Sequence, residues 1–158
     1  MRNNISIRQA NPQEAAAIAQ LVGRLLSEIM STTGVQAFQF DLDATTERLE
    51  QFLEQGKYWV FVAEDGGTLT GFLSMYECYA LYAEGVFGTM AEFYIDPAYR
   101  GQGLGQALLD EAKTFGRERG WKRLEVTTPP LPEYARTLSF YEREGFAVAG
   151  GRKMKVLL

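Results

Sequence analysis

The first part of the chain carries two different spacings of apolar side chains. Residues 5–10, ISIRQA, alternate between apolar and polar side chains and predict a short strand. Asn11 suits a helix N-cap, and Glu14 stands three residues later, as in a capping box. The apolar residues that follow have helical spacing: Ala15, Ile18, Ala19, Val22, Leu25, Leu26 and Ile29. We therefore expect a long helix with one buried face, followed by a shorter helix over residues 43–55.

The middle of the chain is typical of strands. Residues 58–64, YWVFVAE, are rich in aromatic and β-branched side chains, and the turn DGGT leads into a return strand at residues 69–79. Another strand is expected at residues 89–95, TMAEFYI. The first two of these strands are predicted to pair as a hairpin, because only a short turn separates them.

The last part of the chain alternates between the two types of element. The pattern predicts a helix over residues 104–119, a strand at RLEVTT, a helix over residues 135–144 and a final strand pair, FAVAG and KMKVLL. The full order is β-α-α-β-β-β-α-β-α-β-β. It predicts one α/β domain of the mixed α+β kind over residues 1–158, with a central mixed sheet of about seven strands and helices on both faces.

Composition places the chain among ordinary globular proteins. It has 158 residues, of which 46% are hydrophobic and 23% charged. No apolar run approaches the roughly 18 residues of a membrane span, and the start has no signal-peptide pattern, so we expect a cytoplasmic protein without a membrane partner. The net charge of −4 argues against a nucleic-acid partner, which needs a basic surface.

The chain has no histidine and only one cysteine, and both facts limit the catalytic groups and metal sites that it can form. The chain has no histidine, which excludes Ser-His-Asp and Cys-His catalysis and the common zinc sites, and we expect no bound metal. Cys78 is the only cysteine, so no internal disulfide forms. A general base must therefore be a carboxylate, a tyrosine, a lysine, a terminus or water.

The stretch YRGQGLGQALL contains a glycine-rich turn before a helix. Glycines allow a close backbone approach, and a helix N-terminus attracts anions, so this turn predicts a pyrophosphate site. A P-loop is excluded because no Gly-Lys-Ser/Thr occurs. The dinucleotide motif G-x-G-x-x-G also fails, because position 106 is Gln106.

The hexapeptide RGQGLG, residues 100–105, matches the motif [RQ]-x-x-G-x-[GA] of the GCN5-related N-acetyltransferases. The stretch LSFYEREGF, about 40 residues later, resembles a second element of that family. The chain resembles the family over nearly its whole length. The resemblance implies transfer of an acetyl or longer acyl group from coenzyme A, with acetyl-CoA as co-substrate, to a small amine or a peptide N-terminus. Homodimers are common in the family, and the aromatic-rich loops offer apolar surface.

The resemblance also implies where the co-substrate lies. Backbone groups of Phe93, Tyr94 and Ile95 are expected to bind the pantetheine arm. The pyrophosphate is expected at Arg100 and at the backbone N–H groups of Gly101, Gln102, Gly103, Leu104, Gly105 and Gln106. Tyr134 stands where many members carry an asparagine that contacts the cofactor.

Two residues are the catalytic candidates. Tyr141, in LSFYE, is expected to protonate the leaving thiolate, because a phenol with a pKa near 10 is protonated at neutral pH. Glu92 shares strand parity with Tyr94 and is the candidate base. A role for Glu92 in binding a cationic acceptor remains open, as do acidic contacts from Glu77 or Glu84.

The acceptor itself is left open. The resemblance points to residues 30–42 and 78–88, which combine aromatic side chains with carboxylates. The rival hypothesis is a non-catalytic module or sensor that binds acyl-CoA.

Overall fold

The computed structural model describes residues 4–158. The chain forms two compact units, Met1–Thr127 and Thr128–Leu158. The expectation of one domain over residues 1–158 stays a prediction.

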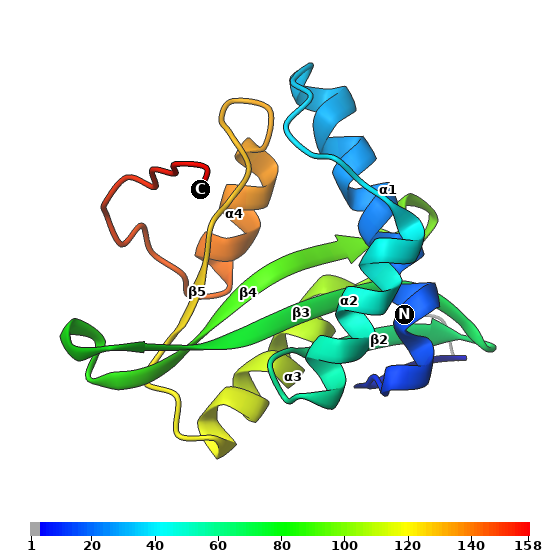
Figure 1. Ribbon diagram of the computed structural model, residues 1–158, viewed down its shortest axis with the longest axis horizontal. Coiled ribbons are helices and arrows are strands. Elements are labelled where there is room, and N and C mark those ends of the chain that lie inside the picture. Colours follow the sequence, from blue (N-terminus) through cyan, green and yellow to red (C-terminus); the bar gives the residue numbers. More distant parts are fainter. Residues whose placement is uncertain (1–3) are drawn as a thin grey trace. The chain divides into compact units, whose positions relative to one another are not determined.

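The first unit is built on one sheet with strand order β1-β2-β3-β4-β5 (Figure 1). The strands are β1 (Ile5–Gln9), β2 (Trp59–Asp65), β3 (Thr68–Ala80), β4 (Gly85–Ile95) and β5 (Leu124–Val126). Strands β1 to β4 pair antiparallel, and β5 pairs parallel with β4. The predicted mixed sheet is therefore confirmed.

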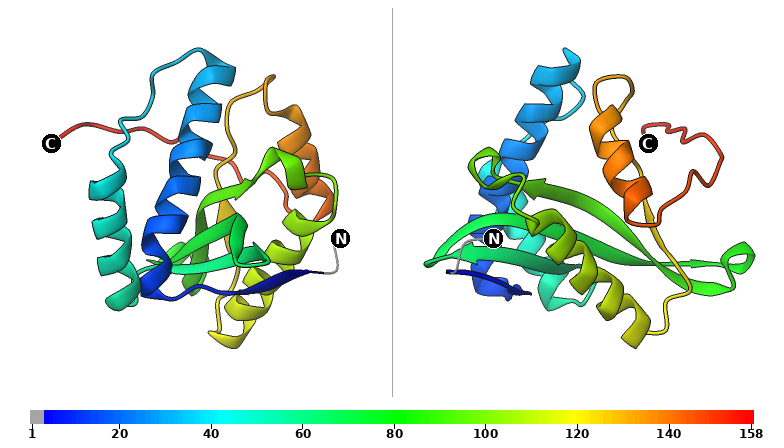
Figure 2. Two further views of the ribbon diagram at one scale, coloured as in Figure 1. Left: turned by 90° about the vertical axis from the view of Figure 1, so that its right-hand side faces the viewer. Right: turned by 180° about the vertical axis from the view of Figure 1, so that it is seen from behind.

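Helices cover both faces of this sheet (Figure 2). On one face, α1 (Ala15–Thr33) and α2 (Leu42–Glu54) bury an apolar cluster that includes Ile18, Leu49 and Phe72. On the other face, α3 (Leu104–Glu118) places the ring of Phe115 5.5 Å from that of Trp59 and 5.7 Å from that of Phe61. The prediction of helices on both faces is confirmed.

The predicted final strand pair is wrong. After α4 (Ala135–Arg143) the chain continues to Leu158 without a helix or strand, so the sheet has five strands among the described residues instead of about seven. Side chains of this segment, such as Val148, Met154 and Val156, are exposed. An alternating sequence becomes a strand only when a neighbouring strand pairs with its backbone. No strand of the described chain pairs with these residues.

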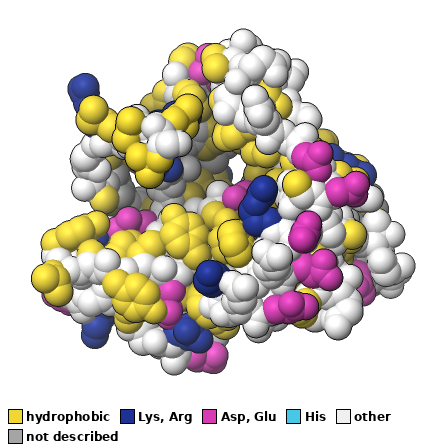
Figure 3. Space-filling view, viewed as in Figure 1, with side chains coloured by type: hydrophobic (Ala, Val, Ile, Leu, Met, Phe, Trp, Pro, Cys, Tyr) yellow, Lys and Arg dark blue, Asp and Glu magenta, His cyan; other side chains and the backbone are white. Residues whose placement is uncertain are grey.

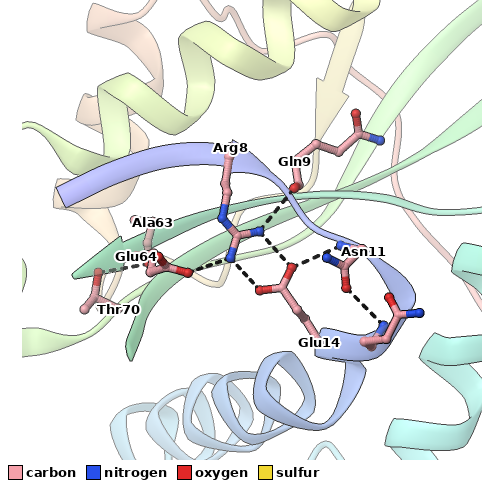
Figure 4. A network of polar contacts seen from close by, with 8 residues as sticks. Arg8, Gln9, Asn11, Glu14, Ala63, Glu64 and Thr70 are labelled. Atoms are coloured by element: carbon pink, nitrogen blue, oxygen red, sulfur yellow. Dashed lines mark hydrogen bonds and ion pairs between the residues drawn. The ribbon is translucent and has the colours of Figure 1, made fainter. Parts of the chain in front are cut away.

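The start of the first helical segment is anchored by Arg8 (Figure 4). The Arg8 guanidinium donates hydrogen bonds to both carboxylate oxygens of Glu14, at 2.8 and 2.7 Å, and to Glu64 at 2.6 Å. The hydrogen bond from Arg8 lowers the pKa of Glu14. Asn11 and Glu14 form the predicted capping box, here on the 3₁₀ turn η1 (Pro12–Glu14) that precedes α1. Arg8 thereby links β1, β2 and the entry to α1.

Candidate active site

A β-bulge in β4 lies directly before Glu92. Ser74 of β3 pairs with Glu92, whereas the next residue, Met75, pairs with Met90, so Ala91 is an extra residue in β4. Because Ser74 and Met75 point to opposite faces of the sheet, their partners Glu92 and Met90 do so as well. The bulge therefore directs Glu92 to the face that α1 and α2 cover.

The Glu92 carboxylate is half-buried and receives hydrogen bonds from Ser74 of β3 and from Tyr58, which directly precedes β2. The Ser74 hydroxyl donates to its Oε1 at 2.5 Å, and the Tyr58 hydroxyl donates at 3.3 Å. Burial raises the pKa of Glu92, although both hydrogen bonds stabilise the charged form and act in the opposite direction. A carboxylate with a raised pKa binds a proton more readily than an exposed carboxylate, which suits it to act as a base.

A cavity of about 210 Å³ opens beside this carboxylate. It is enclosed by α1, α2, the segment between these helices, and the sheet. Its lining residues are Ile18, Val22, Leu26, Gln39, Phe40, Thr45, Arg48, Leu49, Phe52, Tyr58, Val60, Phe72, Ser74 and Glu92. Among the described residues of this lining, Glu92 is the only acidic one and Arg48 the only basic one. The cavity can therefore hold a small molecule against a single carboxylate.

The two segments expected to contact the acceptor are placed differently. Phe40, from the segment between α1 and α2, lines the cavity, whereas Asp41 caps α2 by accepting a hydrogen bond from the Ala44 N–H at 2.8 Å. Residues 78–88 form the far end of the β3–β4 hairpin. Ala80, in the last pair of this hairpin, stands six positions after Ser74 on β3, a span of about 20 Å.

Hydrophobic side chains gather over this end of the hairpin (Figure 3). Tyr79, Leu81 and Tyr82 are among its exposed residues. Glu77 accepts hydrogen bonds from the Trp121 indole N–H at 2.7 Å and from Arg119 at 3.0 Å, and these partners lower its pKa against the opposing effect of burial. Glu77 is thus engaged away from the cavity, and Glu84 lies in the left-handed turn beyond it.

The sequence alone did not indicate three of the cavity residues that bear on its chemistry, namely Tyr58, Ser74 and Arg48. Tyr58 and Ser74 lie within apolar runs that predict strands, and only the pairing of β2, β3 and β4 brings them to Glu92. The sequence carries one signal for the contact between Ser74 and Glu92. The Ser74 hydroxyl lies inside the apolar run GFLSMY, and a buried polar side chain needs a hydrogen-bond partner.

The glycine turn before α3 contains two residues in the left-handed conformation. Gly101 and Gly103 have φ values of +75° and +84°, a conformation that side chains with a Cβ rarely adopt. Gly103 is the N-cap of α3, and no side chain caps this helix. The N–H groups of the first turn, from Leu104 to Gln106, therefore have no partner within the helix and can bind an anion.

Arg100 links the turn to two other elements. Its Nε donates to the backbone oxygen of Ile95 at 2.8 Å, and its two Nη groups bind the carboxylate of Glu28 at 2.8 and 2.9 Å. The hydrogen bond to Glu28 raises the pKa of Arg100. The guanidinium joins the end of β4 and α1 to the start of the turn, which holds the turn in place.

Beyond Met90, β4 leaves β5. The parallel pairing covers only Gly88–Met90 with Leu124–Val126, while β4 continues to Ile95. The Asp96 N–H donates to the Thr70 oxygen at 2.8 Å, and hydrogen-bonded pairs alternate along an antiparallel ladder. The backbone of Tyr94 is therefore directed toward β3, and the backbones of Phe93 and Ile95 are directed to the other edge.

The second unit contains the remaining two candidates. Tyr141 lies in α4 with its ring 5.3 Å from that of Phe146, and burial raises its pKa, so its hydroxyl keeps its proton at neutral pH. Tyr134 precedes α4, and its hydroxyl oxygen is buried without a hydrogen-bond partner among the described residues. A buried hydroxyl of this kind can bind a polar group of a ligand.

Within residues 4–158, no group of three or more acidic, cysteine or histidine side chains could hold a metal ion. No helix in that part of the chain is long and apolar enough to cross a membrane.

A model of the acetyltransferase (GNAT) family matches residues 24–146. The uncharacterized N-acetyltransferase YhfO of Bacillus subtilis (strain 168) is 28% identical, over 90% of this chain and 89% of its own. An aminoglycoside acetyltransferase from an uncultured soil metagenomic sample, solved with trehalose, has a TM-score of 0.77 at 23% identity and covers 99% of this chain and 97% of its own. A predicted acetyltransferase from Clostridium acetobutylicum, solved with acetyl-CoA, has a TM-score of 0.76 at 16% identity, with 96% of each chain covered.

Proposed function

The chain belongs to the acetyltransferase (GNAT) family and is an acyltransferase, and we propose that it moves an acetyl group from acetyl-CoA to a primary amine by direct attack of the amine on the thioester. The observation that carries this proposal is the half-buried Glu92 carboxylate, with its raised pKa, facing a cavity near the end of β4. The acceptor is a small amine or a peptide N-terminus.

The residues of the first unit fit the two parts of the co-substrate, whose thioester supplies the acetyl group. The backbones of Phe93 and Ile95, which are directed away from β3, have the extended β4 conformation that suits the amides of a pantetheine arm. The first-turn N–H groups of α3, beside Gly101 and Gly103, suit the pyrophosphate. Arg100 holds that turn to α1 through Glu28. Tyr134, which belongs to the second unit, has a hydroxyl that suits a polar group of the co-substrate.

Proton movements are assigned to two side chains. A protonated amine cannot attack, so the Glu92 carboxylate accepts a proton from the acceptor, directly or through a water. The Ser74 hydroxyl, from β3, and the Tyr58 hydroxyl, from the residue before β2, orient this carboxylate. The Tyr141 hydroxyl, which its raised pKa keeps protonated, is the proton donor for the leaving thiol.

The rival is a non-catalytic module that binds acyl-CoA on the same fold. In such a module Glu92 would only bind a cationic group, whereas in the transferase it accepts a proton from the amine. Thiol release from acetyl-CoA with a panel of primary amines distinguishes the two. Release that depends on the amine supports the transferase. Acetyl-CoA binding, seen as a thermal shift that NAD and ATP do not produce, with no release for any amine would support the module.

A further inference from the structure

We propose that the acceptor is a small amino acid, with an amine and a carboxylate in one molecule, and that Arg48 binds the carboxylate at the mouth of the cavity. This inference rests on the proposed function, because it names the substrate class of the same site.

Arg48 occupies an unusual place on α2. The residues of α2 that line the cavity, Thr45, Arg48, Leu49 and Phe52, follow the helical spacing of 3, 4 and 7 residues and form its inner face. The acidic residues of α2 form the opposite, outer face: Asp43, Glu47, Glu50 and Glu54. Figure 3 shows acidic side chains gathered over this helix. The only basic residue of α2 thus stands on the face where an apolar residue would be expected.

No carboxylate of the described chain pairs with Arg48. The positions three and four residues away on the helix are Ala44, Thr45, Gln51 and Phe52, none of which is acidic. By contrast, Arg8, Arg24 and Arg100 each form an ion pair. A guanidinium presents its donors in a fixed fork that matches a carboxylate, so an unpaired one at a cavity mouth suits an acidic ligand.

The two charged side chains of the cavity lie at different distances from its mouth. Glu92 is half-buried at the sheet, whereas Arg48 is exposed at the mouth, and aromatic and aliphatic side chains lie between them. An amino acid is expected to bind with its amine toward Glu92, its carboxylate toward Arg48 and its apolar carbons against residues such as Phe40 and Phe52. This orientation places the reacting nitrogen next to the base.

Size and charge both argue against a polycation. The cavity of about 210 Å³ lies below the range of about 300–1,000 Å³ found for drug-sized ligands. Its lining offers one carboxylate and one fixed positive charge, and the positive charge repels additional amines. The acceptor is therefore expected to differ from the aminoglycosides named for the structural neighbour described above.

The test compares amines that differ only in the carboxylate. The probes are 6-aminohexanoate against hexylamine, and phenylalanine against 2-phenylethylamine, with an aminoglycoside as the polycation. Acetyl transfer is followed as kcat/KM, and binding to the protein with coenzyme A is measured by calorimetry. We expect the carboxylated member of at least one pair to be preferred by about 10-fold or more, as for a hydrogen-bonded charge pair.

The Arg48→Gln variant should lower that preference about 10-fold, and Arg48→Lys should keep part of it. Arg117→Gln is the matched control, because it removes an exposed arginine from α3 on the other face of the sheet and should leave the preference unchanged. Equal use of both members in both pairs, a preferred aminoglycoside, or an unchanged preference in folded Arg48→Gln overturns the inference.

Failure of the inference and failure of the proposed function give different results. Acetyl transfer without carboxylate preference overturns the amino acid acceptor but leaves the transferase. Carboxylate-dependent binding that Arg48→Gln removes, with no acetyl transfer to any probe, supports the Arg48 site and contradicts the transferase.

Discussion

The hydroxyl of Ser74 bridges two parts of Glu92. Its Oγ accepts a hydrogen bond from the Glu92 backbone N–H at 2.9 Å and donates one to the carboxylate oxygen Oε1 at 2.5 Å. The backbone contact lies directly after the extra residue Ala91. The Ser74 side chain therefore fixes the β4 backbone beside the bulge, and it also orients the carboxylate of the candidate base.

Ser74→Ala should shift the acidic limb of the pH–rate profile to higher pH. The Ser74 hydrogen bond stabilises the charged carboxylate and lowers the pKa of Glu92, so its loss lets that pKa rise further. Rate is measured from pH 5 to pH 9. Thr70→Ala is the control, because it removes another buried β3 hydroxyl, which binds the Ala63 oxygen instead. A limb that moves equally in both variants would contradict the positioning role.

Glu92→Gln should be slow at neutral pH and recover as the pH approaches the pKa of the acceptor amine. Glutamine keeps the shape and hydrogen bonding but cannot take the proton, and a neutral amine no longer needs a base. Rate against pH is compared for both proteins with the best amine. Parallel profiles with equal kcat would mean that water or another carboxylate is the base, and a uniform loss would make Glu92 a binding residue.

Glu92→Gln should also stabilise the fold at neutral pH. The folded state raises the pKa of Glu92 above its usual 4.5, so the folded state binds this proton more tightly than the unfolded chain. The contribution of this group to stability is complete below the usual pKa and falls as the pH rises through the raised one. Thermal unfolding should show similar melting temperatures below pH 4.5 and a gain for the variant at pH 8, about 2–4 °C for each kcal/mol. A variant that melts lower at pH 8 contradicts this.

Gly103→Val should weaken acetyl-CoA binding about 10-fold or more, a loss of about 1.4 kcal/mol. The backbone at φ +84° suits glycine, and valine would move the N–H groups of the helix start. Gly120→Val is the matched control, because Gly120 has φ +79° at the other end of α3 and also meets open space. Affinity is measured by calorimetry on folded variants. Equal affinities for the two variants would place the pyrophosphate elsewhere.

Tyr141→Phe should lower kcat about 10²-fold with little change in acetyl-CoA affinity. The change keeps the buried ring and removes the proton. Tyr82→Phe, at an exposed tyrosine of the hairpin, is the control and should keep kcat. Because burial raises the pKa of Tyr141, wild-type kcat should not fall between pH 7 and pH 9 through loss of this proton. Full kcat in Tyr141→Phe would assign the residue to packing alone.

Much of the scaffold follows from local patterns in the sequence. The capping box at Asn11, the apolar stripe of α1 and the glycine turn before α3 are each encoded within a few residues, because helix periodicity, caps and positive φ values depend on near neighbours. The same local motifs identified the family, which the match over residues 24–146 confirms.

The candidate site depended on the tertiary structure. Ser74 and Glu92 come from β3 and β4, and Tyr58 directly precedes β2, so their meeting is set by strand register and by the bulge at Ala91. The same pairing turned Glu77 to the other face, and the final strand pair did not form, although its alternation is typical of strands. The alternation of apolar and polar residues shows only which side chains share a face of a strand. The residue that stands opposite, and the cavity enclosed between helix and sheet, depend on contacts between residues far apart in the chain.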